Sequence, residues 1–384
     1  MIHAASFVEA ARELGFYRYA GVPCSFLTPF INYIINDENL NYVSSANEGD
    51  ALATAAGAAI GGEGAVVMMQ NSGLGNAVSP ITSLCYVFRI PLLIITTHRG
   101  APGLKDEPQH ELMGTITGAL FDTMQVAWEN FPSEETEIRP TLARAMQTMQ
   151  EERRPYGLIM KKDTVLPYDL AQGAVTATGN RKTVKKTFTT PERDNVSRND
   201  ALRQIVRHTP AENTVVLATT GYTGRELYAI EDRINQLYMV GSMGCVSSLG
   251  LGLALARPDL TVVVIDGDGA ALMRMGNFGT IGAYAGNNLV HILLDNEVHD
   301  STGAQATVSG SVVFADIASA CGYSVAYSGN DLRMLDELFE HKPAGGPRFG
   351  HLKIRPGTID NLPRPGITPE HLLRRLMGHL GTHF

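Results

Sequence analysis

The sequence predicts an α/β protein made of two doubly wound domains, each with a parallel sheet. Short apolar runs rich in valine, isoleucine and leucine alternate with helical patterns along the chain. These runs are apolar at nearly every position, as strands are when helices cover both faces of a parallel sheet. The length of 384 residues suits two domains of ordinary size.

The individual elements follow from these runs. We expect strands at residues 17–22, 65–70, 91–97 and 157–162 in the first part of the chain. In the second part we expect them at residues 214–220, 261–267, 289–295, 324–328 and 350–356. Helices are expected at residues 1–16, 48–61 and 141–152, where apolar positions recur at helical spacing or small residues predominate.

The composition changes between residues 166 and 198. This stretch has little apolar periodicity and is rich in proline, glycine, threonine and basic residues, which indicates a linker. We interpret its basic cluster "RKTVKK" as a solvated face of that linker. A new helix begins at "SRNDALRQIVRHT". The predicted domains are therefore residues 1–165 and 199–384.

Composition and charge argue against several classes of function. The net charge of −8 makes nucleic acid an improbable partner, and no apolar run is long enough to span a bilayer. The four cysteines are far apart and form no CxxC pair, which argues against a zinc site and for reduced thiols. The first residues have acids where a signal peptide has bases, so we expect a cytoplasmic protein.

Two polar residues end neighbouring predicted strands in "VVVIDGDGAALMRMGNFGTIGAYAGNNLVHILLDNEVHDSTG". Asp268 follows one strand, and Asn296 follows the next, 28 positions later. The carboxyl ends of parallel strands meet at one edge of a sheet, where ligands bind. These side-chain oxygens, with the main-chain carbonyl of Val298, suit Mg²⁺ or Ca²⁺. An isolated Asp-Gly turn is the plain alternative, but the polar residues at 299–305 favour a site for a magnesium-bound diphosphate.

This pattern resembles the signature of thiamine-diphosphate enzymes. The segments "GSMG" at 241–244 and "SSANEGDALATAAGAAIGG" at 44–62 extend the resemblance to both halves of the chain. It implies that Met243 supports the bent cofactor and that the Gly241 carbonyl accepts a hydrogen bond from its aminopyrimidine. The helix that begins near Cys245 would direct its amino terminus at the diphosphate. Glu48 would bind the pyrimidine ring nitrogen, which requires a carboxyl in an apolar pocket with a raised pKa.

Within that family, the chain is similar to the phosphonopyruvate decarboxylases. The similar segments are "YAGVPCSFLTPFINYI", "NEGDA", "MMQNSGLGNAVSPITSL", "KDEPQHELMG", "GYTGREL" and "LLDNEVHDSTGAQ". The resemblance implies decarboxylation of 3-phosphonopyruvate to phosphonoacetaldehyde in phosphonate and antibiotic biosynthesis. It also implies thiamine diphosphate and Mg²⁺ as cofactors, a pyrimidine-binding domain followed by a diphosphate-binding domain, and a homo-oligomer with active sites between subunits. Cys24 departs from the pattern, because relatives often have an acid there.

The resemblance assigns roles to particular residues. The catalytic candidates are Glu48, His299 and His110, and the metal ligands are Asp268, Asn296 and Val298. The cofactor contacts are Glu48, Gly73, Asn76, Gly221, Gly241, Met243, Gly267, Asp268, Gly269, Ala270 and Asn296. The candidates for binding the substrate are Ser25, Arg99, Lys105 and His110, since a phosphonate needs cationic or hydrogen-bonding partners. Arg99 and Lys105 are equally well explained as solvated loop charges, and His110 as a residue that packs its helix.

Three other functions remain alternatives. Sulfopyruvate decarboxylase, or another decarboxylase of 2-keto acids with the same cofactor, would use the same chemistry on a similar substrate. A non-catalytic subunit is disfavoured because both Glu48 and the Asp268–Asn296 pair are present. A nucleotide-dependent dehydrogenase is disfavoured because Val78 occupies the third glycine position of the near match "GLGNAV".

Overall fold

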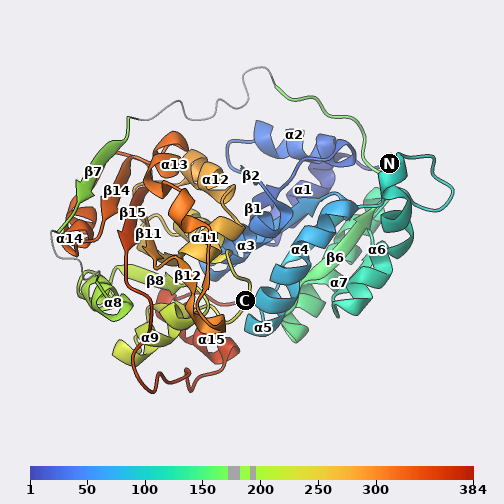
Figure 1. Cartoon of the computed structure of the whole chain (residues 1–384). Coiled ribbons are helices and arrows are strands. Elements are labelled where there is room, and N and C mark those ends of the chain that lie inside the picture. The colour runs from blue at the N-terminus through green and yellow to red at the C-terminus, as the bar shows by residue number, and fades with distance from the viewer. Residues whose placement is uncertain (172–181, 191–195) are drawn as a thin grey trace. The chain divides into compact units, whose positions relative to one another are not determined.

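The computed structural model describes residues 1–171, 182–190 and 196–384. The chain divides into two compact units, Met1–Ala177 (with Phe384) and Thr178–His383. Each unit has a parallel sheet with helices on both faces, which confirms the predicted fold class (Figure 1). None of the helices in the described part of the chain combines the length and apolar character needed to cross a bilayer.

In the first unit the strands lie in the order β2-β1-β3-β4-β6-β5, and each neighbouring pair is parallel. The strands are β1 (Phe16–Gly21), β2 (Asn41–Ser44), β3 (Gly64–Met69), β4 (Leu93–Thr97), β5 (Ala127–Asn130) and β6 (Tyr156–Met160). The helices are α1 (Ala4–Glu13), α2 (Thr28–Asn36), α3 (Glu48–Ile60), α4 (Leu74–Pro80), α5 (Tyr86–Phe88), α6 (Glu111–Thr123) and α7 (Glu135–Glu152).

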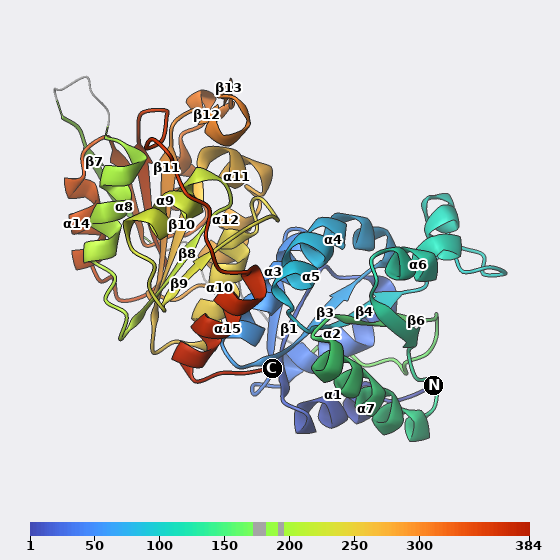
Figure 2. The same ribbon diagram turned by 90° about the horizontal axis from the view of Figure 1, so that it is seen from below.

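Two layers of helices cover this first sheet, and Figure 2 shows them on its opposite sides. Side chains of α1, α2 and α7 form one buried cluster with alternate strand residues such as Val66 and Leu158. Gly157, the neighbour of Leu158, faces the other side, where the ring of Phe121 in α6 lies 2.9 Å from the position of a Cβ. Because the side chains of a strand alternate between its two faces, both faces of the sheet are buried.

In the second unit the strands lie in the order β7-β14-β15-β11-β10-β8-β9, again with parallel neighbours. The strands are β7 (Val184–Phe188), β8 (Thr214–Ala218), β9 (Gln236–Tyr238), β10 (Thr261–Gly267), β11 (Leu289–Asp295), β14 (Val325–Gly329) and β15 (Arg348–Lys353), and a separate antiparallel pair is β12 (Val298–His299) with β13 (Gln305–Ala306). The helices are α8 (Arg198–Arg207), α9 (Tyr222–Ile230), α10 (Val246–Ala256), α11 (Asp268–Met273), α12 (Asn277–Tyr284), α13 (Phe314–Ala320), α14 (Arg333–Glu340) and α15 (Pro369–Leu380).

The second sheet is also covered on both faces. Phe278 of α12 packs against His291 of β11 and Phe349 of β15. The next residue, Gly350, faces the opposite side, where Leu338 of α14 lies 2.7 Å from the position of a Cβ. Helices of the second unit therefore cover both faces of its sheet.

The prediction of a linker over residues 166–198 is wrong for Val184–Phe188, which form β7. Val184–Phe188 form the edge strand of the second sheet, with Lys185 paired to Asp316 at 2.8 Å and Lys186 paired to Glu337 at 2.6 Å. An edge strand has a neighbour on one side only and is mostly exposed, so its composition does not distinguish it from a linker. Lysines on such a strand discourage pairing with another chain. Residues 172–181 and 191–195 of the predicted linker lie outside the described residues.

Candidate active site

Each sheet has two adjacent strands whose connections leave in opposite directions. They are β1 and β3 in the first unit, and β8 and β10 in the second. Open α/β sheets bind ligands at the carboxyl ends of such strands. Ser25 follows β1, Gly73 follows β3, Gly221 follows β8 and Asp268 follows β10. The topology therefore indicates a binding site at the carboxyl edge of each sheet, where the residues of the sequence motifs also lie.

Glu48 begins α3 beside the end of β3. Asn47 caps the helix by accepting a hydrogen bond from the Gly49 amide at 2.8 Å, and Asn76 Nδ2 donates to Glu48 Oε2 at 2.8 Å. Gly73 leaves room for the carboxyl, because a Cβ there would lie 2.2 Å from Glu48 Oε1. The structure thus brings Glu48, Gly73 and Asn76 together.

The surroundings of Glu48 differ from the expected apolar pocket. Its carboxyl is only partly buried in this single chain, and its neighbour is the polar amide of Asn76. The physical reason is its position in the first turn of α3, which lies at the end of the sheet, whereas the following residues of α3 from Gly49 to Ile60 are buried.

Arg99 is already engaged by a carboxylate of its own loop. Its guanidinium donates to Asp106 through Nη2 and through Nε, the latter at 3.0 Å, and the Gly100 amide donates to the same carboxylate at 3.0 Å. The hydrogen bonds from Arg99 hold the pKa of Asp106 far below its usual range. Arg99 also lies over the ring of Phe26, 5.2 Å from its centre. Arg99 is therefore not a solvated loop charge. Asp106 already occupies two of its donors, which leaves fewer for a ligand.

The other substrate candidates of the first unit differ in exposure. Lys105 and Ser25 are exposed, whereas His110 is 2% exposed and its Nδ1 has no hydrogen-bond partner among the described residues. Cys24 is buried, with its thiol 3.5 Å from Gln70 Oε1 and 3.8 Å from Thr97 Oγ1. All four lie after β1 or β4, at the carboxyl edge of the sheet.

Asp268 and Asn296 follow adjacent strands of the second unit. Gly267 of β10 is paired with Leu294 of β11, so the two polar residues extend from neighbouring strand ends. Asp268 is 4% exposed, and burial raises the pKa of its carboxyl although a hydrogen bond from Thr307 acts in the opposite direction. A buried carboxylate in this position gains from a cation.

The amide of Asn296 has a defined orientation. Its Nδ2 donates to Asp300 Oδ2 at 2.6 Å, and its Oδ1 accepts from the Val298 amide at 3.3 Å. The described residues contain no cluster of three or more histidines, cysteines or acids able to hold a metal. A cation here would therefore depend on one carboxylate together with amide and main-chain oxygens, a set that suits Mg²⁺ better than Zn²⁺.

Asp295 ends β11, and the sequence reasoning missed its partners. Its fully buried carboxylate accepts from His351 at 2.8 Å, Lys353 at 2.7 Å and Ser309 at 2.8 Å. Burial alone would raise the pKa of Asp295, but these hydrogen bonds lower it to about 2. His351 and Lys353 lie more than fifty positions away on β15, and no sequence signal connects them to Asp295.

The remaining predicted residues of the second unit surround the same strand ends. A Cβ at Gly269 would lie 2.4 Å from His299 Cε1 and 3.1 Å from Met243 Cε, so all three residues meet. Gly221 precedes α9 with a positive φ of 92°, and the hydroxyl of Ser301 lies 3.5 Å from the position of its Cβ. Gly241 is partly exposed in the turn before α10, and Ala270 is buried in α11.

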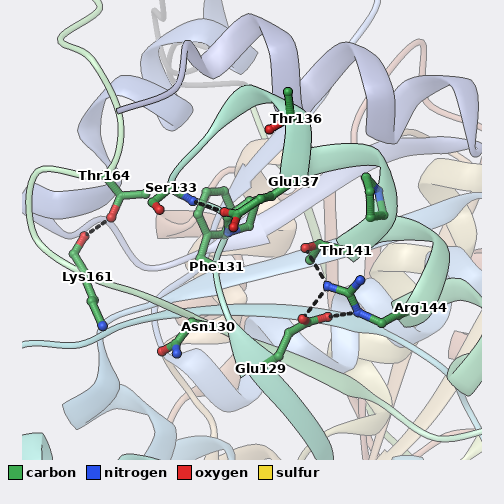
Figure 3. Close-up of a pocket in the computed structure, with 12 residues that line it drawn as sticks. Glu129, Asn130, Phe131, Ser133, Thr136, Glu137, Thr141, Arg144, Lys161 and Thr164 are labelled. Carbon is green, nitrogen blue, oxygen red and sulfur yellow. Dashed lines mark hydrogen bonds and ion pairs between the residues drawn. The ribbon is translucent and has the colours of Figure 1, made fainter.

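A separate cavity of about 560 Å³ opens where β5 ends and α7 begins (Figure 3). Its wall includes the ion pair between Arg144 and Glu129 at 2.7 Å, and also Phe131 (Figure 3). Its lining includes none of the predicted site residues. This cavity is therefore separate from the predicted site, which motif and topology indicate together.

Comparison with known proteins agrees with this geometry. The family described as thiamine pyrophosphate enzyme, N-terminal TPP binding domain, matches residues 1–122, and the corresponding C-terminal TPP binding domain matches residues 220–347. The chain is 43% identical to a phosphonopyruvate decarboxylase of Streptomyces viridochromogenes, over 100% of this chain and 96% of that protein. The chain belongs to the thiamine pyrophosphate enzymes.

Other relatives of this thiamine pyrophosphate enzyme extend the comparison. A phosphonopyruvate decarboxylase of Streptomyces hygroscopicus is 41% identical over 98% of this chain and 93% of its own. A sulfopyruvate decarboxylase of Methanosarcina acetivorans is 29% identical over 96% of this chain and 95% of its own. The solved structure of the thiamine diphosphate-dependent 4-hydroxybenzoylformate decarboxylase of Rhodococcus jostii has a TM-score of 0.71 at 13% identity, covering 93% of this chain and all of that one, which supports the fold alone.

The residues present fit the cofactor of a thiamine pyrophosphate enzyme. The buried Asp268 carboxylate, with a hydroxyl as its hydrogen-bond donor, suits a divalent cation that holds a diphosphate. Gly73 and Gly269 leave open the positions that a side chain would fill beside Glu48 and His299. The chemistry of these donors therefore matches both ends of the cofactor.

Proposed function

We propose that this chain decarboxylates 3-phosphonopyruvate to phosphonoacetaldehyde and CO₂, with thiamine diphosphate and Mg²⁺ as cofactors. The observation that carries the proposal is the full-length identity of 43% and 41% to two phosphonopyruvate decarboxylases. The site supports it, because Glu48 follows β2 in the first unit and Asp268 and Asn296 follow β10 and β11 in the second. Such a reaction serves phosphonate biosynthesis, including that of phosphonate antibiotics.

The difficult step is the departure of CO₂ from a 2-keto acid, because the electron pair of the broken bond needs an acceptor. Bound thiamine diphosphate supplies that acceptor. The protein must therefore hold the cofactor, orient the keto acid, and provide one proton to replace CO₂ on the product carbon.

Asp268 and Asn296 would hold the diphosphate end of the cofactor through Mg²⁺. Asp268 provides a carboxylate oxygen, and Asn296 provides an amide oxygen whose orientation is fixed by Asp300 and the Val298 amide. The Val298 carbonyl would be the third protein ligand, and the remaining ligands of Mg²⁺ would come from outside the protein. Gly221, Gly241, Gly267 and Gly269, which lack a Cβ, would let the main chain approach the cofactor closely, and Ala270 is the proposed contact beside them.

Glu48 acts at the other end of the cofactor. It would donate a hydrogen bond to the pyrimidine ring nitrogen, and Asn76 Nδ2 donates to its Oε2 at 2.8 Å. Met243 provides the apolar support between the two ends. Following the family resemblance, we also propose that the active protein is a homo-oligomer with its active sites between subunits.

The substrate has a carboxylate and a phosphonate to be recognised. We assign the phosphonate to the loops after β1 and β4, which present Ser25, Arg99 and Lys105. An imidazole can both accept and donate a proton. We therefore assign His299 the proton that replaces CO₂, and His110 the orientation of the substrate. We also propose that the enzyme acts in the cytoplasm.

Incubation of the purified chain with phosphonopyruvate tests the proposal. We expect phosphonoacetaldehyde to form only when thiamine diphosphate and Mg²⁺ are both present, and chelation of Mg²⁺ to abolish turnover. Glu48→Gln should lower turnover by about 10²–10⁴-fold, the usual contribution of a positioned acid or base. Sulfopyruvate assayed in parallel is the decisive control, because faster turnover of sulfopyruvate would replace the proposed substrate.

A further inference from the structure

We propose that Asp300, Arg198 and Glu226 form a positioning network that fixes Asn296 with its oxygen toward the Mg²⁺ site. The inference rests on the proposed function, because it assigns the purpose of the network to cofactor binding. None of the three residues is among the predicted ligands, and none needs to contact the cation. They would act through the amide of Asn296.

Two neighbours select one orientation of the Asn296 amide. Asp300 Oδ2 accepts from its Nδ2 at 2.6 Å, and the Val298 amide donates to its Oδ1 at 3.3 Å. An amide turned by 180° would place two acceptors together at Asp300 and two donors together at Val298. The carboxylate of Asp300 therefore determines that Asn296 presents an oxygen, and an oxygen is what Mg²⁺ binds.

Arg198 provides the positive charge that the buried Asp300 carboxylate needs. Its Nη2 donates to Asp300 Oδ2 at 2.6 Å, and the Gly357 amide donates to both Asp300 oxygens at 3.2 Å. The Arg198 side chain is 7% exposed and that of Asp300 is 8% exposed. A carboxylate removed from water in this way is stable only when it is paired and hydrogen-bonded.

Glu226 holds the other arm of the guanidinium. Arg198 Nη1 donates to Glu226 Oε1 at 3.0 Å and to the Gly357 carbonyl at 2.9 Å, while Thr358 donates to the same Glu226 oxygen at 2.7 Å. Arg198 is the first residue of α8, after a capping box formed by Ser197. The start of α8 is therefore tied to the loop that follows β11, 102 positions later in the chain.

The surroundings of Arg198 permit a chemical rescue experiment. A cavity of about 390 Å³ is lined by Arg198, Glu226 and residues 355–360. In an Arg198→Ala variant this cavity would extend to the vacated guanidinium position. A small guanidinium compound can then occupy that position, whereas a purely structural loss of packing would not be reversed by such a compound.

The test measures binding of thiamine diphosphate by calorimetry over a series of Mg²⁺ concentrations, well below the unfolding temperature of each variant. We expect Asp300→Ala and Arg198→Ala to weaken the apparent affinity for Mg²⁺ by about 10–100-fold, as loss of a residue that orients a metal ligand usually does. Ethylguanidinium at millimolar concentration should restore much of the affinity of Arg198→Ala and leave wild type unchanged.

The matched control is Asp232→Ala, which removes a carboxylate paired with Arg375 at 2.7 Å before β9, outside the strand ends of the site. It should lower the thermal stability while leaving the Mg²⁺ affinity within about twofold of wild type. Where Asp300→Ala does not fold, Asp300→Leu decides, because leucine keeps a similar shape but removes the oxygen that accepts from Asn296 and Arg198.

The outcomes separate the network from the proposed function. Asp300 variants with the Mg²⁺ affinity of wild type, or an Arg198→Ala variant that ethylguanidinium does not restore, would overturn the network. A wild-type chain that binds no thiamine diphosphate in the presence of Mg²⁺ would instead overturn the proposed function.

Discussion

A single missing methyl group decides where the carboxyl of Glu48 can lie. Gly73 has a φ of −71°, which any residue can adopt, so its backbone does not require glycine. Glycine is needed at this position for steric reasons, since a Cβ would lie 2.2 Å from Glu48 Oε1 and 2.5 Å from Glu48 Cδ. The position of a proposed catalytic acid therefore depends on a residue in another helical segment.

Gly73→Ala should lower turnover by about 10²-fold, because a displacement of about 1 Å in a catalytic group commonly costs that much. The measurement is kcat for phosphonopyruvate at saturating cofactor, with thermal unfolding followed in parallel. Gly75→Ala is the matched control, since its Cβ would meet nothing within 4 Å. It should keep full activity and gain up to about 1 kcal/mol of stability from helix propensity. Equal activity of the two variants would contradict the role given to Gly73.

The sequence could predict the residues at the strand ends but not all of their partners. Asp268 and Asn296 are identifiable because each directly follows an apolar run, and parallel sheets bring such ends together. Arg99 was also identifiable by its place after a strand, but its pairing with Asp106 depends on how the loop folds back. The contact between Arg198 and Asp300 joins residues 102 positions apart, and no periodicity or motif records it.

At the scale of elements, the loop between β4 and α6 is closed by one carboxylate. Asp106 accepts from Arg99, from the Gly100 amide and from the Glu107 amide at 2.9 Å. These bonds connect the residues directly after β4 with those directly before α6. We therefore expect the conformation of the loop, and the direction of Arg99, to depend on the charge of Asp106.

Asp106→Asn should lower the free energy of unfolding by about 1–2 kcal/mol at neutral pH, the usual value of hydrogen bonds to a charged group that remains partly exposed. The pKa of Asp106 in the folded protein is lowered by Arg99, so its ionised form stabilises the fold fully above the unfolded value of about 4. That contribution is lost as the pH falls from there through the folded pKa.

Denaturant unfolding at several pH values provides the measurement for Asp106→Asn. The difference from wild type should be constant between about pH 5 and pH 7 and narrow below about pH 4. Glu107→Gln changes the exposed neighbouring acid and should have little effect at any pH. A difference for Asp106→Asn that grows on acidification would contradict the assigned direction of the pKa shift.

Most of the strands that the sequence misses are less buried than the strands that it predicts. Every strand predicted from an apolar run is present, and β10 and β11 have the predicted bounds. The strands that were not predicted include β2, β5, β7 and β9, which lie at the edges of the two sheets. An edge strand needs fewer apolar residues, so hydrophobic periodicity is weak there even though the backbone pairing is the same.

At the scale of the whole molecule, the chain consists of two units with separate cores. Phe7, Phe30 and Phe131 pack together in the first unit, and Phe278, Tyr323 and Phe349 pack together in the second. A compact unit with its own hydrophobic core can in principle fold alone. The proposed chemistry, however, requires Glu48 from the first unit and Asp268 from the second.

We therefore predict that residues 1–177 and 178–384, produced as two chains, each fold but are inactive alone. Circular dichroism should show a cooperative thermal transition for each fragment, because each is a compact unit with its own packed aromatic residues. Decarboxylation of phosphonopyruvate should appear only when the two fragments are mixed with thiamine diphosphate and Mg²⁺. A mixture in which the first fragment carries Glu48→Gln controls for contaminating activity. Turnover by either fragment alone would contradict the division of catalytic groups, since it would show that one unit contains everything that the reaction needs.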